Sequence, residues 1–255
     1  MEAWEIRTEQ ERVEDTITVF YIFCEDEVSE PIYFQHFETD LIKIQTFGNQ
    51  KSNFTNVMNA IMHGTENDFI KYINNQPTLV NKDIKIWCVY DRDKTDINKR
   101  LKNNDSHFSV SIITAQNAGI KVAWSNDAFE LWVLLHFEEV LLTNNLAADR
   151  QYYYDRLTEI LIGQISTNEE LIRTTTGNRF TYQRNMKKDK FFKALLTEMT
   201  PRIHTAFQRS KSLVAHHNQF TDKALHEKAP CTMVHELVEE LIRLGKKKEY
   251  LHLIE

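Results

Sequence analysis

The first half of the chain alternates short apolar runs with segments of helical spacing. The strongest run, 16–24 (TITVFYIFC), is rich in β-branched and aromatic residues, which is typical of a strand. Similar runs predict three further strands at 41–47, 84–90 and 120–124. A strand that is apolar throughout, without alternation, indicates a parallel sheet covered on both faces.

The segments between these strands predict helices. Pro31 suits the first turn of a helix that starts near Ser29 or Glu30. Apolar residues spaced three and four apart predict a second helix over 53–64. We expect a helix from Thr95 or Asp96 and a strongly apolar one over 127–142 (DAFELWVLLHFEEVLL). The segment 108–117 fits a strand or a helix, and the Asn-Ala-Gly stop at its end favours a helix.

Beyond about Ala147 the signals are helical only. Alternating strands and helices followed by helices alone predict an α/β fold, with a mainly parallel sheet flanked by helices and helical C-terminal additions. We place a boundary near 143–149. The expected organisation is an α/β metal-binding core over 15–145 and a basic helical region over 146–255 that packs on it.

Composition is that of a soluble globular protein, with 42% hydrophobic and 27% charged residues in 255. No apolar stretch approaches the roughly 20 residues that cross a bilayer, so no membrane partner is expected. Residues 1–15 lack the basic and apolar segments of a secretory signal. Three cysteines, at 24, 88 and 231, fit no zinc spacing and are expected to be reduced thiols of a cytoplasmic protein.

Charge is distributed unevenly along the chain. Residues 1–178 hold 16 Lys/Arg and 28 Asp/Glu, whereas residues 179–255 hold 15 and 9. An acidic part joined to a basic part fits a metal site beside a surface that binds a polyanion. Solvated faces that happen to differ in charge explain the asymmetry equally well.

Acids follow two of the predicted strands directly: Glu25 comes after Cys24, and Asp91 and Asp93 come after Tyr90. Ligands of open α/β sheets bind outside the carboxyl ends of the strands, where adjacent parallel strands would bring these acids together. Their mutual repulsion would raise their pKa values, and a divalent cation would relieve it. Oxygen ligands suit Mg²⁺ or Mn²⁺. Alternatively, each acid caps the helix that follows it.

Four segments together resemble the RloB-like family: 23–37 (FCEDEVSEPIYFQHF), 89–93 (VYDRD), 124–140 (WSNDAFELWVLLHFEEV) and 229–242 (APCTMVHELVEELI). This family is associated with bacterial restriction and anti-phage defence loci and belongs to the Toprim-fold nucleases. The resemblance spans roughly residues 16–243 and implies a Toprim-like sheet. In Toprim enzymes a glutamate and a later Asp-x-Asp pair bind Mg²⁺, and that pattern falls on Glu25, Asp91 and Asp93.

The third segment is the most distinctive of the four. The resemblance implies that Ser125, Asn126, Glu130 and His136 lie at or beside the site. The residues themselves predict that Ser125 and Asn126 cap a helix and that Glu130 lies in its first turn, where it either reaches the metal site or completes the cap. His136, among apolar residues, is expected to be a core histidine.

Three positions depart from the family pattern. Asp26 replaces a Gly, Ser29 replaces a Thr, and Asp127 stands where a Pro is more usual. The loop after the first strand therefore gains an acid and loses flexibility, although no predicted ligand is removed.

The C-terminal part carries candidate phosphate-binding residues. Residues 179–228 contain 11 Lys/Arg and 4 Asp/Glu. Lys and Arg neutralise phosphates and exposed aromatic rings stack on bases, although most aromatics here have helical spacing and are expected in the core. Arg202, Arg209 and Lys211 lie along one predicted helix and are expected to hold a scissile phosphate or to stabilise its developing charge.

These observations together predict a Mg²⁺- or Mn²⁺-dependent endonuclease acting on RNA or DNA in anti-phage defence, with Glu130 as a fourth acid. The defence association implies that the uninfected cell restrains this activity, for which a partner ATPase is a candidate. This chain has no GxxxxGK[ST] loop and is not expected to hydrolyse ATP by that route itself. The alternatives are a sensor that keeps the Toprim metal site and binds nucleic acid or nucleotide without cutting, and a primase-like nucleotidyl transferase. The sequence leaves a homo-oligomer open.

Overall fold

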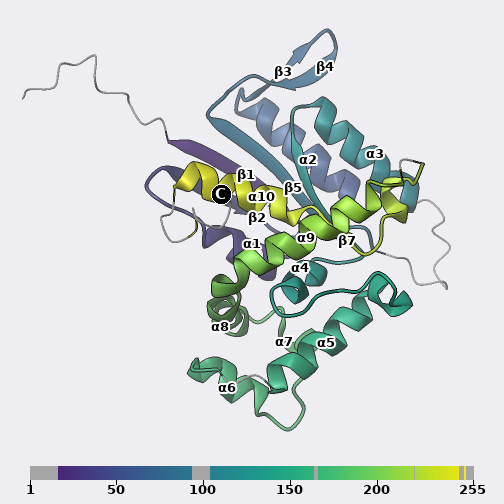
Figure 1. Cartoon of the computed structure of the whole chain (residues 1–255). Helices are drawn as coiled ribbons and strands as arrows, with labels where there is room; N and C mark the ends of the chain where they lie inside the picture. Colours follow the sequence, from purple (N-terminus) through teal and green to yellow (C-terminus); the bar gives the residue numbers. More distant parts are fainter. Residues whose placement is uncertain (1–16, 94–103, 164–165, 221, 247–249, 251–255) are drawn as a thin grey trace, which may run out of the picture.

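The computed structural model of the chain describes residues 17–93, 104–163, 166–220, 222–246 and 250. Its centre is a five-stranded sheet in the order β2-β1-β5-β6-β7 (Figure 1). The strands are β1 (Thr18–Cys24), β2 (Ile42–Phe47), β5 (Ile84–Asp91), β6 (Lys121–Asn126) and β7 (Cys231–Thr232). The first four are parallel and β7 is antiparallel, so the predicted mainly parallel α/β fold is confirmed.

Helices cover both faces of the sheet, which explains why β5 is apolar throughout. Ile86 and Cys88 pack with α2 (Asn53–Glu66) and α3 (Asn104–Asn117) on one face. Trp87 and Val89 point to the other face, where they join a core formed with α1 (Ser29–Gln35), α4 (Glu130–Leu135) and α10 (Val234–Gly245). Because successive side chains of a strand alternate between faces, both sets are buried.

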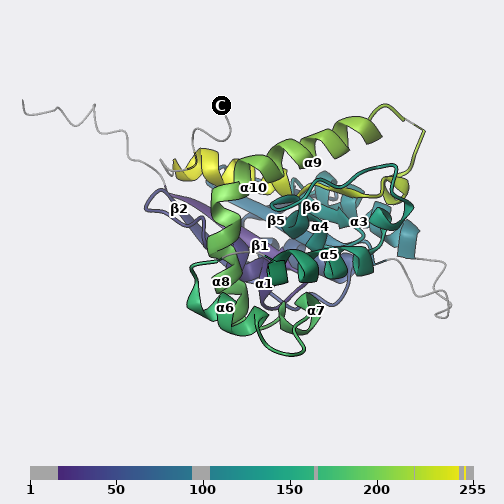
Figure 2. The same ribbon diagram turned by 60° about the horizontal axis from the view of Figure 1, so that its bottom comes forward.

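Most of the C-terminal helices extend the second face. They are α5 (Arg150–Gly163), α6 (Glu169–Thr175), α7 (Tyr182–Asn185), α8 (Asp189–Met199) and α9 (Ile203–His217). Helices α9 and α10 lie side by side along this face (Figure 2). Apolar side chains of these helices belong to the same core as β1. None of the described helices is long and apolar enough to cross a membrane.

The hairpin of β3 (Ile70–Ile73) and β4 (Gln76–Leu79) was not predicted. Its two turn residues, Asn74 and Asn75, have φ of 52° and 63°. Positive φ at both central residues is the signature of a type I′ hairpin turn, which Asn tolerates. The hairpin extends away from the main sheet (Figure 1). The predicted helix over 108–117 is confirmed as α3, whereas the helix expected from Thr95 or Asp96 lies outside the described residues.

The helix predicted over 127–142 is shorter than expected, because α4 covers only Glu130–Leu135. Nη1 of Arg209 donates to the carbonyl of Leu135 at 2.7 Å, so a distant side chain takes the acceptor that another helical turn would use. The predicted cap is also wrong. Ser125 and Asn126 are the last residues of β6, and the cap position is Phe129, without a side-chain hydrogen bond.

The expectation of helices alone beyond Ala147 is wrong at one point. Cys231 and Thr232 form β7, which pairs with the end of β6. The hydroxyls of Ser125 and Thr232 lie 2.9 Å apart across this pair. A two-residue strand is too short to show any periodicity in the sequence.

Candidate metal-binding active site

The sheet order brings the carboxyl ends of β1 and β5 side by side. From β1 the chain runs outward to β2 and then returns past β1 to β5, so these two strands flank the topological switch point where α/β sheets bind ligands. The backbone N–H of Glu25 donates to the carbonyl of Val89 at 3.1 Å. Nδ2 of Asn56, buried on α2, donates to the carbonyls of Phe23 and Val89 at 3.1 and 3.0 Å, which fastens the two strand ends together.

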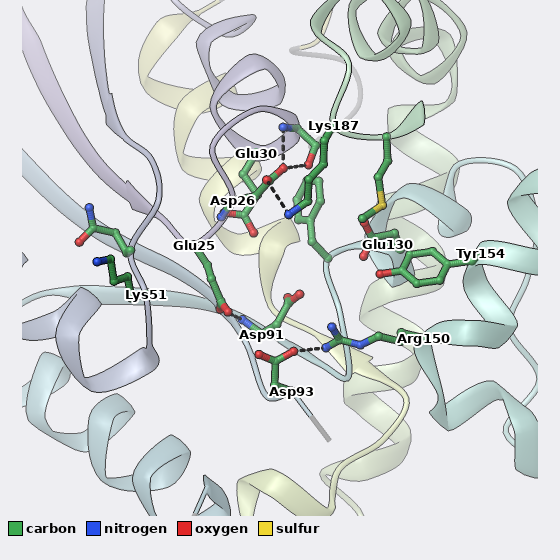
Figure 3. Close-up of a pocket in the computed structure, with 14 residues that line it drawn as sticks. Glu25, Asp26, Glu30, Lys51, Asp91, Asp93, Glu130, Arg150, Tyr154 and Lys187 are labelled. Carbon is green, nitrogen blue, oxygen red and sulfur yellow. Dashed lines mark hydrogen bonds and ion pairs between the residues drawn. The ribbon is translucent and has the colours of Figure 1, made fainter. Parts of the chain in front are cut away.

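A cavity of about 310 Å³ opens at this edge of the sheet (Figure 3). The four acids that the sequence singled out, Glu25, Asp91, Asp93 and Glu130, all line it. Its other lining residues are Asp26, Ser29, Glu30, Gln50, Lys51, Phe129, Arg150, Tyr154, Met186 and Lys187. The structure therefore gathers in one place acids that are more than a hundred positions apart in the sequence.

Glu25 and Asp91 are in direct contact. Oε2 of Glu25 accepts a hydrogen bond from the backbone N–H of Asp91 at 2.9 Å. Oδ1 of Asp91 is buried and has no hydrogen-bond partner among the described residues. A buried acceptor without a partner is costly, so this oxygen is suited to a ligand.

Asp93 does not continue the extended strand, because β5 ends at Asp91 and Asp93 has a left-handed φ of 50°. Aspartate is one of the few side chains that adopt this conformation readily. The carboxylate of Asp93 forms an ion pair with Arg150.

Burial and mutual repulsion disfavour the charged forms of these acids. Burial raises the pKa of Glu25 to about 7, and the charge of Asp93 adds to the effect. Burial, followed by the charges of Glu25 and Glu30, raises the pKa of Asp91 well above its ordinary value. Burial also raises the pKa of Glu130 to about 7. A cation in the cavity would offset this cost by favouring the charged carboxylates.

The loop after β1 is held by its own acids. The carboxylate of Asp26 accepts from the backbone N–H groups of Glu27 at 2.8 Å and Ser29 at 2.7 Å, and from the Ser29 hydroxyl. Oε2 of the buried Glu30 accepts from the N–H of Asp26 at 3.1 Å. Asp26 and Ser29, the two loop residues that depart from the family pattern, thus bond to each other and fix the loop.

The donor set fits a hard divalent cation, because it consists of carboxylate oxygens and includes the unpartnered Oδ1 of Asp91. The described residues nevertheless contain no group of three or more His, Cys, Asp or Glu side chains already gathered to hold a metal ion. One carboxylate oxygen of Glu25 accepts from the N–H of Asp91, and one oxygen of Asp93 pairs with Arg150. Metal binding would require these side chains to turn toward the ion.

Three basic side chains also line the cavity, and sequence reasoning missed all of them as site residues: Lys51, Arg150 and Lys187. Lys187 Nζ lies 3.7 Å from Oδ1 of Asp26. The only available signals were indirect. Lys187 belongs to the basic stretch 179–228, and Arg150 follows the boundary placed near 143–149.

The structure does not bring the predicted phosphate-binding residues to this cavity. Arg202 pairs with Glu198 at 3.3 Å and lies over the Phe137 ring. Arg209 is engaged with the carbonyl of Leu135. Lys211 Nζ pairs with Glu239 at 3.0 Å. The sequence shows that this helix carries several basic residues, but it does not show which surface of the protein each of them faces.

Ser125 and Asn126 have internal partners as well. Nδ2 of Asn126 donates to the carbonyls of His226 and Lys228 at 2.9 and 3.0 Å, and Ser125 bonds to Thr232. They secure the segment that leads into β7 and do not line the cavity. His136 is buried, with Nδ1 2.8 Å from the carbonyl of Trp132, and burial lowers its pKa to about 4. These contacts are those of a core histidine.

The fold and the site define an α/β protein with a cavity at the carboxyl edge of a mainly parallel sheet. Both acidic and basic side chains line this cavity. Within this class, the chain belongs to the RloB-like protein family, whose model matches residues 20–241. No curated protein and no solved structure matches the chain.

Proposed function

We propose that the chain is a Mg²⁺- or Mn²⁺-dependent nuclease that hydrolyses phosphodiester bonds of RNA or DNA. The observation that carries the proposal is the buried, unpartnered Oδ1 of Asp91 in a cavity shared with Glu25 and Asp93. Acids alone would repel a phosphate, whereas acids that hold a divalent cation attract one. The resemblance to Toprim nucleases assigns metal binding to these same three residues.

The acids and the basic residues of the cavity have different roles in the proposed hydrolysis. Glu25, Asp91 and Asp93 would hold the cation, which when bound polarises the phosphate and lowers the pKa of a bound water. Glu130 lines the same cavity, where its carboxylate would accept a proton from the attacking water. Lys51 and Lys187, at the rim, neutralise the phosphates of the bound strand.

The direct test is incubation of the purified chain with labelled RNA and labelled DNA in Mn²⁺, in Mg²⁺ and in EDTA. We expect fragments of at least one substrate in Mn²⁺ or Mg²⁺ and none in EDTA. Metal-dependent binding without fragments would favour the non-cleaving sensor. New product that forms only when nucleotides are supplied would favour the transferase. Equal cleavage in EDTA would contradict the metal-dependent mechanism.

Two lysines of the basic C-terminal part are expected to differ in their effect on nucleic-acid binding. Lys187→Ala should weaken oligonucleotide affinity about tenfold at low salt, because Lys187 lines the cavity. The slope of log affinity against log salt concentration should also become shallower by about one, since one phosphate contact is lost. Lys211→Ala is the matched control, since this lysine pairs with Glu239 away from the cavity. Fluorescence anisotropy over a range of salt concentrations measures both. An equal loss in the two variants would show that the cavity is not the binding site.

We further propose that this nuclease acts in the cytoplasm as an anti-phage effector restrained by a partner ATPase. The resemblance to the RloB-like family supports the defence role. The three cysteines, all free and buried, support a reducing compartment.

A further inference from the structure

Arg150 reaches the cavity from the start of α5 and contacts two carboxylates. Its Nε lies 3.2 Å from Oδ2 of Asp127, and its Nη2 lies 3.1 and 3.3 Å from the carbonyl and Oδ1 of Asp127. The same Nη2 forms an ion pair with Asp93. One guanidinium nitrogen is therefore shared between a residue outside the cavity lining and a candidate metal ligand.

The two carboxylates hold Arg150 with unequal strength. The side chain of Asp127 is 2% exposed and also accepts from the backbone N–H of Arg150 at 3.3 Å, so it anchors both the guanidinium and the first residue of α5. The side chain of Asp93 is 50% exposed, and its backbone, beyond the end of β5, has a left-handed φ. Water and ions compete with an exposed ion pair, whereas a buried carboxylate needs its partner.

The third guanidinium nitrogen of Arg150 is available. Nη1 has no hydrogen-bond partner within the part of the chain that the structure describes. The guanidinium projects into the cavity beside Asp91 and Asp93 (Figure 3). A guanidinium that is fixed along one edge and open along another suits an oxyanion, because its planar fork matches two phosphate oxygens.

We propose that Arg150 binds the substrate phosphate and competes with the divalent cation for Asp93. This inference rests on the proposed nuclease function. While Arg150 pairs with Oδ1 of Asp93, it draws on the charge that would hold the cation. Once a cation takes Asp93, Nη2 loses this partner and Asp127 keeps the guanidinium in place. Nη1 and Nη2 then face the phosphate, so metal loading and phosphate binding are linked through one side chain.

Arg150→Gln should shift two affinities in opposite directions. Affinity for Mn²⁺, measured by the free-ion EPR signal, should rise about two- to fivefold, because Asp93 loses its competitor. Affinity for a short fluorescent oligonucleotide, measured in Ca²⁺ with RNA and with DNA, should fall about tenfold, because a charge-assisted contact is removed. Arg156→Gln is the matched control on the same helix, since Arg156 pairs with Glu138 and Glu159 outside the cavity, and it should change neither affinity.

Arg150→Lys provides a second variant that keeps the charge. It should bind Mn²⁺ about as wild type does, yet bind the oligonucleotide more weakly, because an ammonium lacks the planar fork. Unchanged or weaker Mn²⁺ binding by Arg150→Gln overturns the competition, and unchanged oligonucleotide affinity overturns the phosphate contact. Wild-type protein that binds no Mn²⁺ would instead refute the proposed metal site itself, so the two failures are distinguishable.

Discussion

Asp91→Asn is expected to abolish metal-dependent cleavage and, at the same time, to stabilise the metal-free protein. Loss of a charged metal ligand should lower kcat about a hundred- to a thousandfold. The gain in stability has a separate cause. The pKa of Asp91 is raised well above its ordinary value by burial and by the neighbouring acids, so keeping a carboxyl group there costs folding energy at neutral pH. An amide at this position carries no charge to be buried or repelled, so it should raise the free energy of unfolding in EDTA.

Urea denaturation and a cleavage assay, each with Mn²⁺ and with EDTA, measure the two effects. Wild type should gain stability when Mn²⁺ is added, because the ion binds only the folded state, and Asp91→Asn should gain much less. Asp155→Asn is a suitable control, since Asp155 is exposed on α5 and bonds only to Gln151 among the described residues. Full cleavage by Asp91→Asn, or a variant less stable than wild type in EDTA, would contradict the assignment.

Glu130→Gln should stabilise the protein in a strongly pH-dependent way. Burial raises the pKa of Glu130 from 4.5 to about 7 in the folded state. Below pH 4.5 the carboxyl group of Glu130 is protonated in both the folded and the unfolded protein, so it does not make the free energy of unfolding depend on pH. Between pH 4.5 and 7 the unfolded chain releases the proton while the folded protein retains it, so the free energy of unfolding falls as pH rises. Above pH 7 the charged Glu130 therefore lowers the free energy of unfolding by about 3 kcal/mol relative to its value below pH 4.5.

The appropriate measurement is the difference in unfolding free energy between Glu130→Gln and wild type, in EDTA, from pH 4.5 to 8. Histidines of lowered pKa, such as His136, give wild type an opposing pH dependence, but that contribution is common to both proteins and cancels. The difference should be close to zero at pH 4.5 and should reach about 3 kcal/mol at pH 8. A difference that does not vary with pH would show that Glu130 is not a buried acid of raised pKa.

The sequence predicted the parallel strands and the meeting of Glu25, Asp91 and Asp93 at one edge of the sheet because both depend on local patterns. A strand buried on both faces must be apolar throughout, and acids at its end are visible in a single sequence. The end of α4 could not be predicted, since the side chain that bonds to its last carbonyl, Arg209, is 74 residues away in the sequence. Arg150 and Lys187 reach the cavity only through tertiary packing, and no periodicity distinguishes them from other surface cations.

The antiparallel edge of the sheet has a consequence for biosynthesis. Ser125 and Thr232, which meet across β6 and β7, are separated by 107 residues. While the ribosome is still making the intervening helices, the edge of β6 is an unpaired strand edge, which is prone to associate with other chains. The acids at the ends of β1 and β5 emerge early, but Arg150 and Lys187 emerge later and β7 later still. A nascent or prematurely terminated chain therefore carries the acids of the cavity without Arg150 and Lys187, and it exposes an edge of β6 that the complete chain covers with β7.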